Sequence, residues 1–213
     1  MVRFVLLLLL VGSAPLGALA QALPYGPTLS FAVYRNGEQI GKHTLTFQQN
    51  GSNLTVSTAV DLAVKMLGFT AYRYSHRAQE TWAGDTFQSA STQTDDNGTK
   101  YTVQAKRTPA GIDVQRSSGH EVMPTGVLPS SHWNVRQISQ SSLLNTQNGN
   151  QAQVKVTPLG REKIKTASGW IDATHYRYSG DVTKDQWFDD RGRWVKTTFP
   201  ASDGSTIEYI LQE

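Results

Sequence analysis

The sequence predicts an all-β protein, a single antiparallel meander that curls into a half-barrel or a barrel. Apolar residues recur with a period of two along most of the chain, and short groups of Gly, Asn and Asp residues interrupt the pattern. One run of alternation covers about thirteen residues, well beyond an ordinary strand. A sheet of about a dozen consecutive antiparallel strands protects its unpaired edges when it curves into a barrel or a half-barrel.

The first two strands form a predicted hairpin. Apolar side chains alternate over residues 29–33, and Asn36-Gly37 supplies a turn that favours positive φ. Leu45 and Phe47 then alternate on the return strand. We expect these apolar residues to share the inner face.

The third strand carries the clearest signal. Between Leu54 and Met66 the even-numbered residues are apolar or Thr, and the odd-numbered residues are polar or small. Extended over roughly 43 Å, this strand must curl. Gly68 ends it, and residues 69–83 return. Further strands are expected at residues 86–94, 100–107, 112–116, 151–158, 161–166, 170–179, 185–189, 194–199 and 206–211.

Residues 119–144 lack this alternation. Pro124 and Pro129 interrupt the segment, and Ser130 or Ser131 is a suitable cap for one short helix near residues 130–140. In a barrel, this helix would plug one end.

The fourth strand presents an unusual row of side chains. Tyr72, Tyr74, His76, Glu80 and Trp82 share one face because they lie an even number of residues apart. Their flat apolar surfaces and polar tips are suited to an amphiphilic ligand. We expect three more residues to help line the same cavity: His132, Trp133 and Trp187.

Two other interpretations of this row remain open. Aromatic rows usually support cross-strand packing, and a histidine among them is usually a half-buried polar residue. Catalysis would need a further partner, because His76 and Glu80 are about 13 Å apart along a regular strand. An acid–base pair becomes possible if His132 approaches Glu80. We assign no catalytic residue.

Metal and cofactor motifs are missing. Residues 37–42 have the wrong spacing for a phosphate loop, and His120-Glu121 lacks the second histidine of a zinc-protease motif. We therefore expect no metal and no cofactor. The chain contains no cysteine, so its stability cannot depend on disulfides.

The first twenty residues indicate export. Arg3 precedes a short apolar run, and a small-residue cleavage site ends at Ala20. We expect residues 1–20 to be a cleaved signal peptide, residues 21–27 a lead-in segment and residues 28–213 one β-barrel-like domain. The predicted location is the periplasm. The apolar run is too short for a retained membrane anchor, so no transmembrane segment is expected in the mature chain.

The charge of the mature chain gives no reason to expect nucleic acid as a partner. With Arg3 removed, 19 basic residues face 17 acidic ones, a net charge of +2. Nucleic-acid-binding domains usually gather basic residues on one face, whereas here they are interleaved with acids.

Several motifs together resemble an exported alphaproteobacterial family with a domain of unknown function, of the DUF6134 or DUF3108 kind. These motifs include residues 31–41, the row from Tyr72 to Trp82, residues 129–133 and residues 187–195. The resemblance implies a periplasmic protein of curved β-barrel type, without an established reaction.

The sequence therefore predicts a soluble periplasmic protein that binds or carries a lipid or another amphiphile in a β-barrel cavity. One alternative is an envelope scaffold or interaction protein without a small ligand. Another is a hydrolase or isomerase that uses His76, Glu80 and His132.

Overall fold

The computed structural model describes residues 25–66 and 68–212, in which fifteen strands and one short 3-10 helix are formed. The elements are β1 Thr28–Arg35, β2 Glu38–Asn50, β3 Asn53–Met66, β4 Phe69–Ala83, β5 Thr86–Asp96, β6 Thr99–Thr108, β7 Gly111–Arg116, β8 Gly119–Met123, β9 Leu128–Pro129, η1 Val135–Ser139, β10 Ser142–Leu144, β11 Gln151–Thr166, β12 Gly169–Gly180, β13 Lys184–Asp189, β14 Trp194–Pro200 and β15 Thr206–Leu211. The predicted all-β class is confirmed. The leader predicted for residues 1–20 lies outside the described residues.

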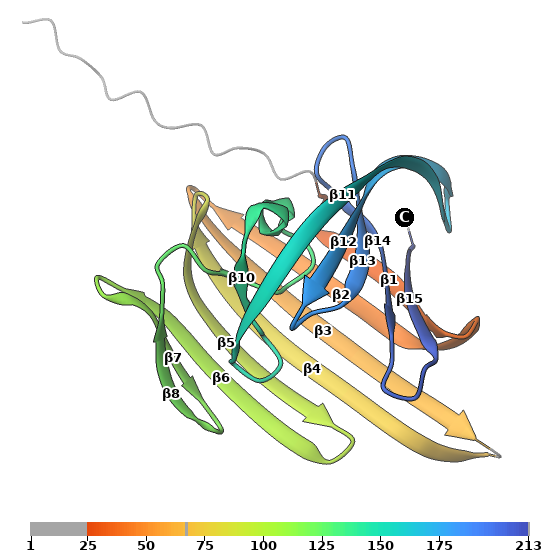
Figure 1. Ribbon diagram of the computed structural model, residues 1–213, viewed down its shortest axis with the longest axis horizontal. Coiled ribbons are helices and arrows are strands. Elements are labelled where there is room, and N and C mark those ends of the chain that lie inside the picture. Colours follow the sequence, from red (N-terminus) through yellow and green to blue (C-terminus); the bar gives the residue numbers. More distant parts are fainter. Residues whose placement is uncertain (1–24, 67, 213) are drawn as a thin grey trace, which may run out of the picture.

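All fifteen strands belong to one strongly curved sheet (Figure 1). Its order is β8-β7-β6-β5-β4-β3-β2-β1-β15-β14-β13-β12-β11-β10-β9, so strands that are neighbours in the sheet are also neighbours in sequence except where β1 meets β15. The strand pairs are antiparallel apart from β9 and β10. No hydrogen-bonded ladder joins the edge strands β8 and β9, and the sheet is an open half-barrel within the described chain.

The inner face follows the period of two. In β3 the even-numbered residues from Leu54 to Val60 are buried, and their odd-numbered neighbours are partly exposed. In β1 the predicted inward residues Leu29, Phe31 and Val33 are fully buried. Asn36 and Gly37 adopt the positive φ values expected of their turn.

The segment 124–150 folds back across the concave face and plugs one end. The side chains of Thr92 and Thr94 donate hydrogen bonds to backbone oxygens of Thr146 and Gln147, which attaches the segment to β5. Trp133 of this segment packs into the core against Trp82, with ring centroids 5.3 Å apart. The interior is therefore filled at one end of the half-barrel.

The expected helix within this segment is present, but as the five-residue 3-10 helix η1. The prediction of Ser130 or Ser131 as its cap is wrong, because the Asn134 side chain accepts from the backbone N–H of Arg136. Three short strands, β8, β9 and β10, also lie in the region expected to be irregular.

One long strand replaces two predicted ones. β11 continues through Pro158, where its register against β12 shifts before Gly160. Proline lacks a backbone N–H, so an irregularity at this position keeps the remaining ladder intact.

No helix in residues 25–66 or 68–212 is long and apolar enough to cross a bilayer.

Candidate functional site

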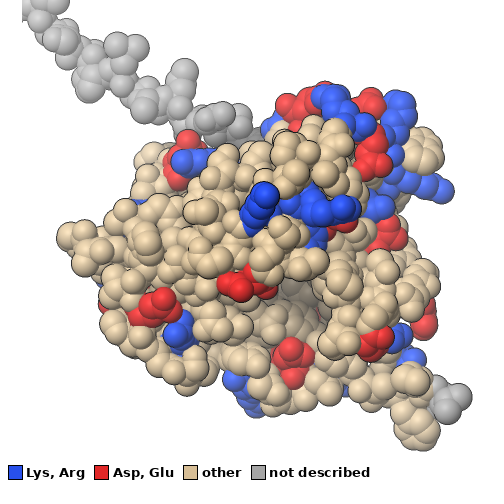
Figure 2. All heavy atoms as spheres, in the orientation of Figure 1, with Lys and Arg blue, Asp and Glu red and all other residues tan. Residues whose placement is uncertain are grey.

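A cavity of about 710 Å³ occupies the end of the half-barrel that the plug leaves free. The inner faces of β3 and β4 form one wall, and the loops at residues 130–132, 145–147 and 199–203 contribute to the others. Figure 2 shows a hollow near the centre of the viewed face, with acidic side chains close to its rim. Its lining extends along β3 and β4 as far as Met66 and Ala71, close to the turn between the two strands, and we call this end the mouth.

The β3 wall is apolar from the packed core to the mouth. Val60 is buried, while the next inward residues, Leu62 and Val64, are partly exposed and face the cavity. Met66 at the rim is 60% exposed, and Phe69 across the turn is 78% exposed. The inward apolar stripe of β3 therefore continues past the packed core, and its last residues are not fully covered by other side chains.

A polar layer crosses the sheet beneath this wall. His43, Val60, His76 and Thr94 are direct neighbours on β2, β3, β4 and β5. We call these four residues the histidine layer. It lies deeper in the half-barrel than the mouth-side neighbours Leu62 and Tyr74.

The histidines of this layer are held neutral. His76 Nδ1 lies 2.8 Å from Thr94 Oγ1, which itself donates to a backbone oxygen, so the imidazole donates to the hydroxyl. Burial, with a smaller contribution from Arg77, lowers the pKa of His76 to about 4. Burial and the neighbouring His76 lower the pKa of His43 to about 3, and neither ring nitrogen of His43 has a hydrogen-bond partner.

Glu80 lies below the histidine layer, at the floor of the cavity. Its Oε2 accepts from Nε1 of Trp82 at 3.0 Å and from Nε1 of Trp133 at 3.3 Å. Burial raises the pKa of Glu80, and these indoles together with the nearby Ser131 hydroxyl oppose the shift. Ser131 Oγ and Glu80 Oε1 nevertheless lack a hydrogen bond of good geometry.

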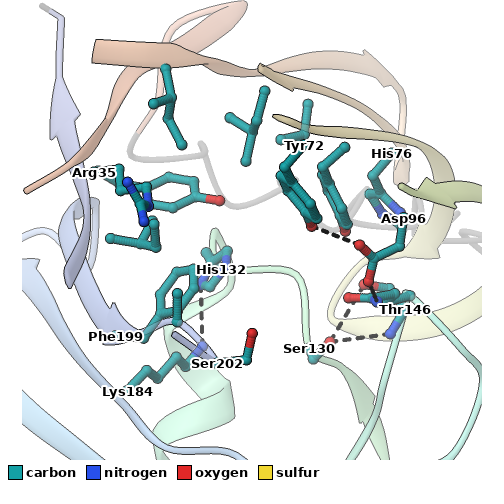
Figure 3. Close-up of a pocket in the computed structure, with 18 of the residues that line it drawn as sticks. Arg35, Tyr72, His76, Asp96, Ser130, His132, Thr146, Lys184, Phe199 and Ser202 are labelled. Atoms are coloured by element: carbon teal, nitrogen blue, oxygen red, sulfur yellow. Dashed lines mark hydrogen bonds between the residues drawn. The ribbon is translucent and has the colours of Figure 1, made fainter. Parts of the chain in front are cut away.

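His132 and Lys184 meet on the wall opposite the tyrosines (Figure 3). Nζ of Lys184 lies 3.1 Å from His132 Nδ1 and 3.3 Å from Oε1 of Gln137 in η1. The His132 ring stacks on Trp194, with centroids 4.7 Å apart. The backbone oxygen of His132 accepts from Gln186, which fixes the loop.

Tyr72 and Tyr74 stand on the β4 side of the mouth. The Tyr72 hydroxyl donates to Asp96 Oδ1 at 2.6 Å, and Gln147 Nε2 donates to the other oxygen of that carboxylate at 3.3 Å. Figure 3 shows Tyr72 and Asp96 across the pocket from His132 and Lys184. The cavity therefore has polar groups on two sides and an apolar wall between them.

The structure brings together most of the residues chosen from sequence. Five of them border the cavity: Tyr72, Tyr74, His76, Glu80 and His132. Trp82 and Trp133 lie in the packed core just beneath the cavity, and both donate hydrogen bonds to Glu80 at its floor.

Trp187 lies elsewhere, on the face of β13 opposite Lys184 and Gln186. Its ring stacks on His175, with centroids 4.2 Å apart, and its Nε1 donates to Glu162 Oε1 at 2.7 Å. Lys184 lines the cavity and Gln186 contacts the loop at His132, so the odd-numbered Trp187 between the even-numbered positions points away.

The acid–base pair considered from sequence is not formed. Glu80 is contacted by Trp133, whereas the neighbouring His132 turns toward Lys184 and His43. In residues 25–66 and 68–212, no group of three or more His, Asp or Glu side chains is placed to hold a metal ion.

Sequence reasoning missed His43 and Lys184. Both lie in the inward phase of their strands: His43 is two residues before Leu45, and Lys184 is two before Gln186. A polar residue in phase with apolar Leu45 and Phe47 is the signal that could have found His43, since burying such a group is costly without a partner. β13 buries residues on both faces, so its pattern gives no such signal for Lys184.

Comparison with solved structures shows the same type of fold elsewhere. The chain is similar to a beta-barrel-like protein of Domain of Unknown Function DUF1849 from Brucella abortus, with a TM-score of 0.62 and 11% sequence identity over 87% of this chain and 95% of that chain. No curated protein matches the sequence. Residues 31–212 match the model of the family described as Domain of unknown function (DUF6134), and the chain belongs to that family.

Proposed function

We propose that this protein binds a lipid or another amphiphile in the cavity between β3, β4 and the loop at residues 130–132, and that it does so after export to the periplasm. The observation that carries the proposal is the inward apolar stripe of β3. Leu62, Val64 and Met66 continue the core pattern into a space that protein atoms do not fill.

An apolar stripe facing water is unfavourable. Each square ångström of apolar surface left uncovered forgoes about 25 cal/mol of stabilisation. A ligand chain lying along Leu62 and Val64 would recover that free energy, and the cavity volume of 710 Å³ falls in the range of about 300–1,000 Å³ typical of ligand pockets.

The floor and sides of the cavity supply the polar contacts that an amphiphile needs. His132 and Lys184 lie deep on one side, and Tyr72 with Asp96 lies nearer the mouth. A polar head directed inward and an apolar chain directed toward Met66 would match this gradient.

Export is supported by the sequence of the first twenty residues, with its basic start, apolar run and small residues before Ala20. In the envelope, a binding protein with its mouth beside exposed Met66 and Phe69 would have access to lipid surfaces.

The test combines recovery of the ligand with a variant of the cavity wall. The protein is purified from envelope extracts and analysed by native mass spectrometry, and envelope lipids are then added back to the stripped protein. We expect a lipid adduct and a rise in melting temperature, because a ligand that binds only the folded state stabilises it.

Val64→Gln places an amide on the apolar wall and is expected to weaken lipid binding at least tenfold. Lys65→Gln, on the exposed face of the same strand, is the matched control and should bind as the unaltered protein does. If no lipid copurifies and none raises the melting temperature, carrier function is wrong and the scaffold alternative is favoured.

A further inference from the structure

Lys184 is a lysine enclosed in the cavity wall. The residue is 6% exposed, and its Nζ contacts His132 and Gln137 while lying 4.5 Å from the centre of the Tyr178 ring. No carboxylate in residues 25–66 or 68–212 forms an ion pair with it. Buried charges in proteins are normally paired, so this exception needs a reason.

The acids that line the cavity already have donors. Glu80 accepts from two indoles, Asp96 is bound by the Tyr72 hydroxyl at 2.6 Å, and Asp203 is paired with Arg35 at 2.5 Å. None of the three is paired with Lys184. The cavity wall therefore contains one cation whose counter-ion is not part of the described chain.

We propose that Lys184 holds the carboxylate of a fatty-acid-like amphiphile, with the chain of that ligand running along Leu62 and Val64 toward the mouth. The inference rests on the proposed function and names its ligand class. An ammonium has three donors, of which His132 and Gln137 take two, so one remains for a ligand oxygen.

The position of Lys184 agrees with this orientation. His132, its contact, is 6.0 Å from His43 of the histidine layer, measured between ring centroids. That layer lies deeper than Leu62 in the register of β2, β3 and β4. A head group at Lys184 would thus leave the apolar wall free for the chain.

Binding of such an acid has a distinct pH dependence. Burial lowers the pKa of Lys184 to about 7, so the amine is largely neutral above that pH. A bound carboxylate favours the ammonium form, and binding must then take up one proton. Affinity should fall up to tenfold for each pH unit above 7 until the pKa of the complex is reached.

The groups around Lys184 do not titrate in that range. Burial lowers the pKa values of the surrounding histidines below neutrality and raises those of the nearby tyrosines above their usual value. These groups are His43, His76, His132, Tyr178 and Tyr209. A free fatty acid has the pKa of an ordinary carboxyl and is ionised throughout. Burial also raises the pKa of Glu80, the other buried acid that lines the cavity, so a dependence between pH 7 and pH 9 reports Lys184 where Lys184→Met abolishes it.

The experiment titrates laurate and 1-dodecanol into the stripped mature protein by calorimetry at pH 7 and pH 9. We expect laurate to bind at least tenfold more weakly at pH 9, and dodecanol to bind equally at both. Lys184→Met should weaken the binding of laurate at pH 7 at least tenfold and leave the binding of dodecanol unchanged. Lys165→Met, at an exposed residue of β11, should change the affinity for neither compound.

Laurate binding that is independent of pH, or unaffected by Lys184→Met, overturns the inference while leaving the proposed function intact. Failure of both compounds and of envelope lipids to bind overturns the proposed function itself. If Lys184→Met does not fold, the pH dependence of laurate binding by Glu80→Gln decides the matter, because that variant keeps Lys184 and lacks the other buried acid of the cavity.

Discussion

Glu80 places a carboxyl group in the least exposed part of the interior, where one of its oxygens accepts from two indoles. Replacing Trp133 or Trp82 would remove one of the two indole N–H donors to the Glu80 carboxylate. A buried polar atom that loses its partner costs about 1–3 kcal/mol, in addition to the lost packing of the ring. Glu80 therefore links the plug to β4 and forms the cavity floor.

The direction of the Glu80 pKa shift leads to a prediction at this scale. Burial raises the pKa, so the ionised form destabilises the fold above the folded-state pKa, and this cost disappears as the pH falls below the unfolded value. Glu80→Gln keeps an oxygen acceptor without the charge. We expect a higher free energy of unfolding than the unaltered protein at pH 8, and no gain near pH 4.

Urea denaturation at the two pH values checks this prediction. Glu38→Gln, an exposed substitution on β2, should leave stability unchanged within about 0.5 kcal/mol. A Glu80→Gln protein that is less stable at pH 8 would show that the carboxylate charge is itself needed by the indoles.

At the scale of elements, the β3–β4 hairpin extends beyond its neighbours in the sheet (Figure 1), and Met66 of β3 lines the cavity. Phe69 near its tip is 78% exposed, so replacing it should not affect folding. If lipids enter from a membrane surface, Phe69→Ser should slow transfer from vesicles several-fold while leaving equilibrium affinity unchanged.

Stopped-flow transfer of a fluorescent fatty-acid analogue measures this rate. Trp170→Ser is a matched control, since Trp170 is 66% exposed in the β11–β12 hairpin, which turns at the end of the sheet away from the mouth. Equal slowing by both substitutions would contradict a role for the β3–β4 tip in lipid entry.

Elements with regular alternation were predictable, and short elements were not. β3 and β4 follow from period two because one face packs and the other meets water. β9 has two residues and β10 has three, which is too few to show an alternation of apolar and polar residues.

The candidate site shows the same division. The row on β4 is inward because its alternation is strong, but β13 buries residues on both faces. Its pattern therefore could not show whether Trp187 or Lys184 faces the cavity. Hydrogen bonds between distant residues, such as that of Trp133 with Glu80, depend on how the plug folds back.

For the whole molecule, the buried histidines make stability depend on pH. In the unfolded chain a histidine takes up a proton near pH 6.5, whereas His43 and His76 do so only near pH 3 and pH 4. Their contribution is complete above pH 6.5 and is lost as the pH falls, by up to about 1.4 kcal/mol per pH unit for each histidine.

His43→Leu tests this dependence because both nitrogens of His43 lack partners. The variant should be more stable than the unaltered protein at pH 5, with a shallower decline between pH 7 and pH 5. Urea midpoints across this range give the slope, and His120→Gln, at an exposed histidine, serves as control. An unchanged slope would mean that His43 is not neutral in the fold.

The pairing of β1 with β15 has a consequence for how the molecule comes into being. β15, the last strand of the described residues, is a neighbour of β1, the first, with Phe31 opposite Leu211. Closing a loop of this length is entropically unfavourable, and folding rates fall as contacts become more distant in sequence. Closure of the sheet at the seam between β1 and β15 therefore waits until β15 has been synthesised, so the two halves of the sheet can form before they are joined.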